Sequence, residues 1–147
     1  MISTRGRYAL RVLIDLAENQ REGYTPLKDV AERQNISLKY LERILPSLTK
    51  NGYIEGLHGR GGGYRLTLSP QECRVGDILC LTEGDMAPVA CLACGADPCD
   101  QAEHCPTLPM WKGFHEMTKQ YFDGITVADL MKKPEKSSGC TENLPFP

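Results

Sequence analysis

Four cysteines in the second half of the chain have the type and the spacing of a metal-binding loop. They follow the pattern C-x2-C-x4-C-x5-C, in a segment that also contains glycine, aspartate and proline. Thiolates are soft ligands, and a loop without regular structure can wrap around a centre so that four of them complete its coordination. We interpret the segment as the site of an iron-sulfur cluster, with four candidate ligands: Cys91, Cys94, Cys99 and Cys105.

Two other chemistries remain open for the same loop. Structural zinc usually uses two short CxxC knuckles, and only Cys91 and Cys94 form one. Reactive thiols or a disulfide switch are the second alternative, although the chain has seven cysteines, so they cannot all pair within it. Outside the loop, Cys80 falls on the apolar side of a short helix and is expected in the core. His104 is able to donate a nitrogen ligand, but a surface position is favoured for it.

The first third of the chain has the pattern of a helix-turn-helix. Hydrophobic periodicity predicts helices over residues 6–20, 25–34 and 37–50. Thr25 is expected to cap the second helix and Ser37 the third. Only about three residues, 34–36, separate these two helices, which is the spacing of a helix-turn-helix.

The third helix would be the recognition helix, because its outer face is polar and carries donors, acceptors and charge suited to base edges. Two alternating segments, 53–57 and 64–68, follow it and predict a hairpin, or wing, around a glycine-rich turn. The wing would reach the minor groove through two cations. The alternative is a helical scaffold that touches no nucleic acid. The candidate DNA-binding residues are Ser37, Lys39, Tyr40, Glu42, Arg43, His58 and Arg60.

The net charge of −2 hides an asymmetry between the two parts of the chain. Residues 1–68 carry eleven Lys or Arg against seven Asp or Glu, a balance of +4, whereas residues 69–147 carry six against twelve, a balance of −6. The split indicates that the first part faces a polyanion. No stretch approaches the roughly 18 apolar residues of a membrane span, and residues 1–5 lack the apolar block of a signal peptide. We therefore expect a cytoplasmic protein with no membrane partner.

A long amphipathic helix is predicted after the cysteine loop. Its apolar stripe is larger than a solvent-exposed helix needs, so it packs either on the N-terminal domain or on a second copy of the chain. These considerations divide the chain into residues 1–70, the DNA-binding domain; 71–133, the cluster-binding loop and the long helix; and 134–147, a disordered tail. The stripe consists of Trp111, Phe114, Met117, Tyr121 and Phe122.

Several of these motifs together resemble the Rrf2 family of bacterial winged-helix transcription regulators, and the resemblance runs from residue 1 to about residue 133. The family implies a dimer in which the long helix, here roughly residues 110–123, crosses its partner, and in which two winged helices read a palindromic operator. The motifs that carry the resemblance are TRGRYAL at 4–10, ISLKYLE at 36–42, NGY at 51–53, GGGY at 61–64, the cysteine loop, and CPT at 105–107 before Trp111.

The resemblance also implies that the three cysteines matching Cys91, Cys99 and Cys105 hold a cluster. One branch of the family uses a histidine three residues after the last cysteine to bind a 2Fe-2S cluster, and this chain has Leu108 there. We therefore favour Cys94 as the fourth ligand and 4Fe-4S over 2Fe-2S. A carboxylate near the N-terminus of the partner subunit serves as ligand in some relatives, so Asp15, like His104, stays an alternative. The wing departs from many members of the family by carrying His58 in place of arginine.

The sequence thus predicts a mainly α fold with a small β-hairpin wing, that is, a winged helix-turn-helix plus a long dimerisation helix. The predicted function is a DNA-binding transcription regulator, expected to be a repressor, that binds double-stranded DNA as a homodimer. It is switched by a cluster that senses iron, redox or nitric oxide status. A cluster-free regulator that responds through thiols or a partner is the alternative, and a zinc-binding or electron-transfer protein is less favoured. Nothing indicates an enzyme, since no substrate pocket, nucleotide motif or acid-base set is present.

Overall fold

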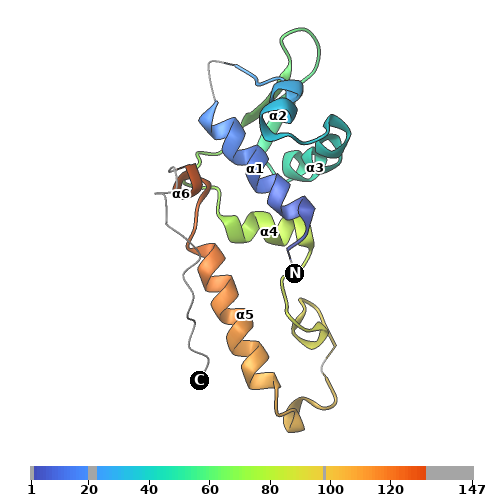
Figure 1. The fold of residues 1–147 in the computed structure, drawn as a ribbon. Helices are drawn as coiled ribbons and strands as arrows, with labels where there is room; N and C mark the ends of the chain where they lie inside the picture. Colours follow the sequence, from blue (N-terminus) through green and yellow to red (C-terminus); the bar gives the residue numbers. More distant parts are fainter. Residues whose placement is uncertain (1, 20–22, 98, 132–147) are drawn as a thin grey trace.

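The computed structural model is mainly helical, with one antiparallel hairpin inserted after the third helix (Figure 1). It describes residues 2–19, 23–97 and 99–131. The predicted tail, residues 134–147, lies outside these residues. The predicted fold class, a winged helix-turn-helix followed by a long helix, is confirmed.

Helix α1 (Thr4–Glu18) is the centre around which the N-terminal elements pack. Ser3 caps it, because its side chain accepts a hydrogen bond from the Arg5 backbone N–H. The inward face of α1 meets apolar side chains of α2 (Leu27–Gln34) and α3 (Leu38–Lys50). The resulting core is fully buried and contains Ala9, Val12, Leu13, Leu16, Val30, Leu41, Ile44, Leu45 and Leu48.

The turn between α2 and α3 has the geometry that a helix-turn-helix requires. Asn35 ends α2 in the left-handed conformation, with φ 52°, which asparagine tolerates better than most residues. Ile36 then enters the core, and the Ser37 hydroxyl accepts a hydrogen bond from the Tyr40 N–H to cap α3. The predicted cap at Ser37 is therefore confirmed.

The wing consists of β1 (Ile54–Leu57) and β2 (Gly63–Leu66), paired antiparallel with Ile54 opposite Leu66. The segment before α2 forms a bridge beside β2, because Thr25 and Tyr64 exchange backbone hydrogen bonds of 2.9 and 2.8 Å. This pairing explains why Pro26, and not the predicted Thr25, is the cap residue of α2. A Cβ atom on Gly63 would lie 2.1 Å from the Thr25 carbonyl oxygen, so the close approach requires glycine.

Helices α4 (Val75–Glu83) and α6 (Val127–Met131) pack on α1 from the side opposite the wing, and the chain segments before them are bridged at Arg74 and Thr126. Cys73, Ile78 and Val127 are buried in the same hydrophobic core as the residues of α1 to α3. In the described residues the core is therefore continuous across position 70.

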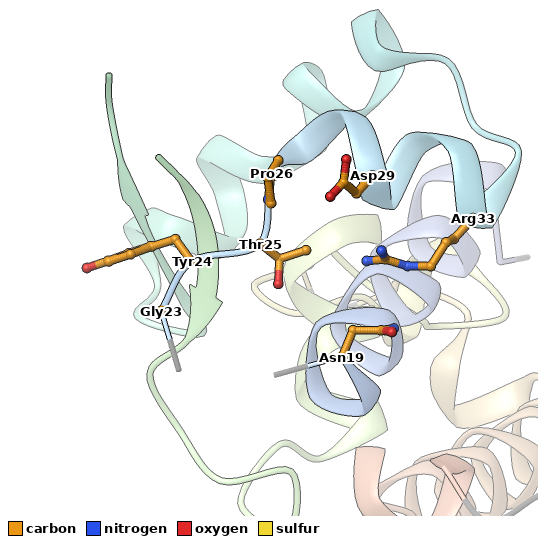
Figure 2. Close-up of a pocket in the computed structure, with 7 residues that line it drawn as sticks. All are labelled: Asn19, Gly23, Tyr24, Thr25, Pro26, Asp29 and Arg33. Carbon is orange, nitrogen blue, oxygen red and sulfur yellow. The ribbon is translucent and has the colours of Figure 1, made fainter. Parts of the chain in front are cut away.

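One charged pair joins α1 and α2 at the edge of this core. Asp15 is 1% exposed and receives hydrogen bonds from the Arg33 guanidinium, the shortest being 2.6 Å, and from the Gln34 amide at 2.8 Å. The carboxylate in turn raises the pKa of Arg33. Figure 2 shows Arg33 reaching from α2 across a polar pocket toward Thr25, with Asn19 of α1 below it. The pair fixes the position of α2 relative to α1.

Helix α5 (Leu108–Asp123) begins far from the bundle and runs back toward it, so that only its C-terminal end approaches α4 and α6 (Figure 1). The chain between α4 and α5 leads away from the bundle, alongside α5, as a loop with two short 3-10 turns, Ala90–Leu92 and Ala102–His104. These two segments stand clear of the winged helix-turn-helix.

Candidate nucleic-acid interface and cysteine loop

The predicted DNA-binding side chains all lie at the surface. Six of the seven are exposed, namely Ser37, Lys39, Glu42, Arg43, His58 and Arg60. The seventh, Tyr40, is half-buried because its ring packs edge-on against Tyr8 of α1, with centroids 5.4 Å apart. The Ser37 hydroxyl also caps α3, so it has a structural role in addition to the predicted one.

A groove of about 330 Å³ brings the recognition helix and the wing together. Leu38 and Glu42 of α3 line one side, and Leu57 and His58 of the wing line the other. Leu38 and Leu57 are each more than two fifths exposed, at 43% and 49%. Apolar side chains left open between polar ones are suited to contact with thymine methyl groups or sugars. The groove, together with the exposed candidate residues of α3 and the wing, is the candidate interface.

The cysteine loop is anchored by an aspartate at its start. Asp85 accepts backbone hydrogen bonds from Ala87, at 2.7 Å, and from Cys94, and these bonds lower the pKa of its carboxyl group. Cys91 lies in the first 3-10 turn, and the Cys99 carbonyl accepts a hydrogen bond from Ala102, at the start of the second turn. The loop thus has a defined backbone path at both ends.

The surroundings of Cys105 favour its thiolate form. Its sulfur lies 3.5 Å from the Thr107 hydroxyl, and this contact, followed by the backbone N–H groups of Thr107 and Leu108, lowers the pKa of the thiol. The thiolate is the form that binds metal. Cys105 is therefore electrostatically suited to the ligand role that the sequence predicts.

The structure does not gather the predicted ligands around one point. Among residues 2–19, 23–97 and 99–131, no group of three or more His, Cys, Asp or Glu side chains is close enough to hold a metal ion. Three of the four loop cysteines are exposed and Cys105 is half-buried, so none of them is held in the core. Their thiol groups suit a soft metal centre, but in this structure they do not lie close together.

The structure bears on two sequence-based expectations: Asp15 as an alternative fourth ligand, and Cys80 as a core residue. Asp15 is buried inside the N-terminal bundle and is occupied by Arg33 and Gln34, so it is not free to leave its site for a metal. Cys80 was expected in the core and is exposed instead. The reason is that α4 buries Ile78, Leu79 and Thr82 against the bundle, which turns Cys80 to the outside.

Cys80 shares a pocket of about 310 Å³ with Cys94 of the loop and His115 of α5. The His115 Nδ1 atom is buried and has no hydrogen-bond partner among the described residues. Burial, and next the negative charge of Asp123, raise the pKa of the Cys80 thiol. Helical periodicity carries no signal for this juxtaposition, because the three residues come from three separate segments.

Glu83 is a further residue for which the sequence predicts no role. Its Oε1 atom accepts hydrogen bonds from the Ser3 backbone N–H, the Ser3 hydroxyl and the Gly6 N–H, at 3.1, 2.9 and 3.1 Å. A carboxylate at this position also interacts favourably with the N-terminal end of the α1 dipole. A Cβ atom on Gly6 would lie 2.4 Å from the same oxygen. The last residue of α4, directly before the cysteine loop, therefore holds the start of α1.

Helix α5 exposes the apolar stripe that the sequence predicts. None of its residues is buried; Met117 and Tyr121 are 65% and 67% exposed, and Phe114 is 50% exposed. Trp111 and Phe122 are half-buried. Of the two predicted alternatives, packing of this stripe on the chain's own N-terminal domain is excluded for these exposed side chains.

Three helices, a polar recognition face and an adjoining glycine-rich hairpin define a winged helix-turn-helix DNA-binding protein. Comparison with known proteins agrees with this class, since a family model described as "Rrf2: Iron-dependent Transcriptional regulator" matches residues 2–133. The chain belongs to the Rrf2 family of transcriptional regulators.

Its relatives include proteins named HTH-type transcriptional regulator IscR. The one from Aliivibrio salmonicida is 35% identical over 130 residues, covering 88% of this chain and 76% of the relative, and the one from Erwinia tasmaniensis is 34% identical, covering 91% and 80%. Among solved structures, the global cysteine regulator CymR of B. subtilis is similar, with a TM-score of 0.72, 33% identity and coverage of 89% and 95%. The IscR of T. potens has a TM-score of 0.71, 30% identity and coverage of 97% and 93%.

The helices of the described part of the chain include none that is both long enough and apolar enough to cross a membrane.

Proposed function

We propose that this protein is a repressor that binds a palindromic operator as a homodimer and is switched by an iron-sulfur cluster in the cysteine loop. The observation that carries the DNA-binding part is the groove shared by α3 and the wing, where Glu42 and His58 line opposite sides. A recognition helix in the major groove and a wing at the adjacent minor groove account for this geometry. The surplus of positive charge in residues 1–68 supports it.

Alanine at Tyr40, Arg43 or Arg60 is expected to weaken operator binding by about 1–3 kcal/mol each, because each change removes a base or minor-groove contact. Fluorescence anisotropy with an operator duplex, selected from random DNA, measures the loss. Arg74→Ala is the matched control, since Arg74 is an exposed arginine directly before α4 that does not line the groove. Circular dichroism should show unchanged folding in all four variants. Unchanged affinity in all three interface variants would contradict the proposal that α3 and the wing contact the operator.

The case for the cluster rests on the donor set and on the family. Four uncommitted thiols, one with a lowered pKa, occur in one loop, and the matching family model is described as iron-dependent. Cys91, Cys99 and Cys105 would hold the cluster, with Cys94 as the favoured fourth ligand and 4Fe-4S as the favoured type. Such a group supplies a centre whose stability depends on iron supply, oxidants and nitric oxide. In the cytoplasm, where we place the protein, thiols stay reduced and available for it.

The apolar face of α5 supports the homodimer, with a second copy of the chain as its partner. In a monomer, Phe114, Met117 and Tyr121 would leave a large apolar area in contact with water. Burying such surface is favourable by about 25 cal/mol for each Å². A helix that stands clear of its own bundle can cross an identical helix without rearrangement of the core (Figure 1). The same contact would fix the spacing of the two winged helices on the operator.

We expect a dimer in light scattering at micromolar concentration, in both the apo and the cluster-bound forms. Replacing Met117 and Tyr121 together with glutamate should give a folded monomer, because it puts charges into the apolar contact. Replacing Lys112 and Lys119 with glutamine tests exposed α5 positions outside the stripe and should leave the dimer intact. A wild-type monomer in both forms would contradict the proposal.

A second candidate is a cluster-free regulator that responds through its thiols. It is favoured by the shared pocket of Cys80 and Cys94 and by the likeness to CymR, which is named a cysteine regulator. Optical absorption of anaerobically purified protein separates the two. Broad visible absorption with bound iron and sulfide supports the cluster, and colourless protein that still binds the operator supports the thiol-based regulator.

A further inference from the structure

A small hollow lies between the first turn of α1 and the recognition helix, outside the groove that α3 shares with the wing. Arg5, Tyr40, Arg43 and Ile44 line it, and its volume is about 120 Å³. Arg5 and Arg43 are both exposed, and within the described part of the chain neither makes a salt bridge. Two uncompensated cations at one hollow repel each other and favour the entry of an anion.

The two arginines are carried by helices whose relative position is fixed. Tyr8 of α1 packs edge-on against Tyr40 of α3, at 5.4 Å and 81°, and the guanidinium carbon of Arg43 lies 6.0 Å from the centre of the Tyr40 ring. On the other side, Glu83 holds the start of α1 through Ser3 and Gly6. Arg5 therefore projects from a clamped first turn rather than from a loose end of the chain.

We propose that this hollow binds a backbone phosphate of DNA, with Arg5 as a donor contributed by α1 beside Arg43 of the recognition helix. The proposal rests on the proposed DNA-binding function, to which it adds the phosphate strand that flanks α3. A recognition helix in the major groove lies between two phosphate strands, so basic side chains beside it are placed to contact the backbone. Arginine is suited to phosphate because its planar donors form two parallel hydrogen bonds.

A phosphate contact has a signature that a base contact lacks. It carries no sequence information, so its loss lowers the affinity for operator DNA and for random DNA by the same factor. It also releases counterions, so each lost contact makes the slope of log K against log salt shallower by about 0.9, or roughly 1.8 for a dimer on two half-sites. Both readouts are independent of the state of the cysteine loop.

The test compares Arg5→Gln with Arg7→Gln by anisotropy, using operator and random duplexes over a range of salt concentrations. Both substitutions remove one positive charge from α1, but residues two apart on a helix point about 200° apart, so Arg7 faces away from the hollow. Arg7 contacts Thr4 of its own helix, at 3.3 Å. Thermal melts check that both variants are folded.

We expect Arg5→Gln to lower the affinity for both duplexes on the order of tenfold and to make the salt slope shallower by roughly 1.8. Arg7→Gln should leave the slope unchanged. Equal effects of the two variants would show a general charge effect and overturn the phosphate site. Wild-type binding by Arg5→Gln, together with weaker binding by Arg43→Ala, would overturn the site and leave the proposed function standing. Wild-type binding by Tyr40→Ala, Arg43→Ala and Arg60→Ala would overturn the proposed function itself.

Discussion

Replacing Cys99 with alanine is expected to remove the cluster entirely, with loss of visible absorption and of bound iron and sulfide after anaerobic reconstitution. A cluster held by four protein ligands loses one of the four in this variant. Cys91→Ala and Cys105→Ala should behave in the same way. The wild-type protein should contain about four iron atoms per chain if the cluster is 4Fe-4S.

The control for these variants is Cys80→Ala, which removes an exposed thiol outside the loop and should keep the wild-type cluster. Cys94→Ala decides the fourth ligand. If it keeps a wild-type Mössbauer spectrum while Cys80→Ala loses it, the fourth ligand is Cys80, which shares a pocket with Cys94. If all four loop variants keep a wild-type cluster, the loop is not the site.

The cluster variants should also change operator binding. A group that binds only one of two conformations shifts their populations by its differential affinity. The loop starts directly after Glu83, which holds the first turn of α1, so a change in the loop has a short path to the DNA-binding helices. Operator affinity measured with and without the cluster should therefore differ in wild type and be the same in Cys99→Ala.

The second large effect is expected from Arg33→Ala, which should lower the free energy of unfolding by about 3 kcal/mol. The substitution leaves the Asp15 carboxylate, 1% exposed, without its charged partner. This destabilisation is at the lower end of the range for removing one partner of a buried ion pair. Gln34 still donates to Asp15, and the Arg33 side chain is itself 36% exposed. Urea unfolding followed by circular dichroism measures the change.

Lys28→Ala on the same helix is the matched control. Lys28 pairs with Glu32 at 3.8 Å, but the two side chains are 80% and 69% exposed, so the substitution should cost at most about 0.5 kcal/mol. If Arg33→Ala is no more destabilising than Lys28→Ala, the ion pair with Asp15 does not hold α2 on α1 as we infer. Preserved stability together with lost DNA binding would instead give Arg33 a role at the interface.

The local structure of the DNA-binding part could be predicted in detail from the sequence. Helix α3 and its cap at Ser37 follow from hydrophobic spacing and a side-chain hydrogen bond within three residues. The hairpin follows from alternation on both sides of a glycine run. The prediction of Thr25 as a cap was wrong, because its backbone pairs with Tyr64, which is far away in the sequence.

The chemical character of the cysteine loop could be predicted from the sequence, but its arrangement could not. Residue type and spacing identify thiols that suit a soft metal, and these properties are local. Their mutual distances depend on the path of an irregular loop, which no local pattern specifies. The same limit applies to Cys80, whose predicted burial was wrong because α4 packs on α1 through Ile78 and Leu79.

The sequence by itself determined the helices, the wing, the polar recognition face and the family, since all of these depend on periodicity, turn residues and short motifs. Tertiary structure alone decided which charges are neutralised and which stay free. Asp15 is buried under Arg33, Glu83 caps α1, and Arg5 and Arg43 stay unpaired at one hollow. The reason is that burial and charge pairing join residues that are 18 to 80 positions apart in the chain. No local pattern specifies such distances.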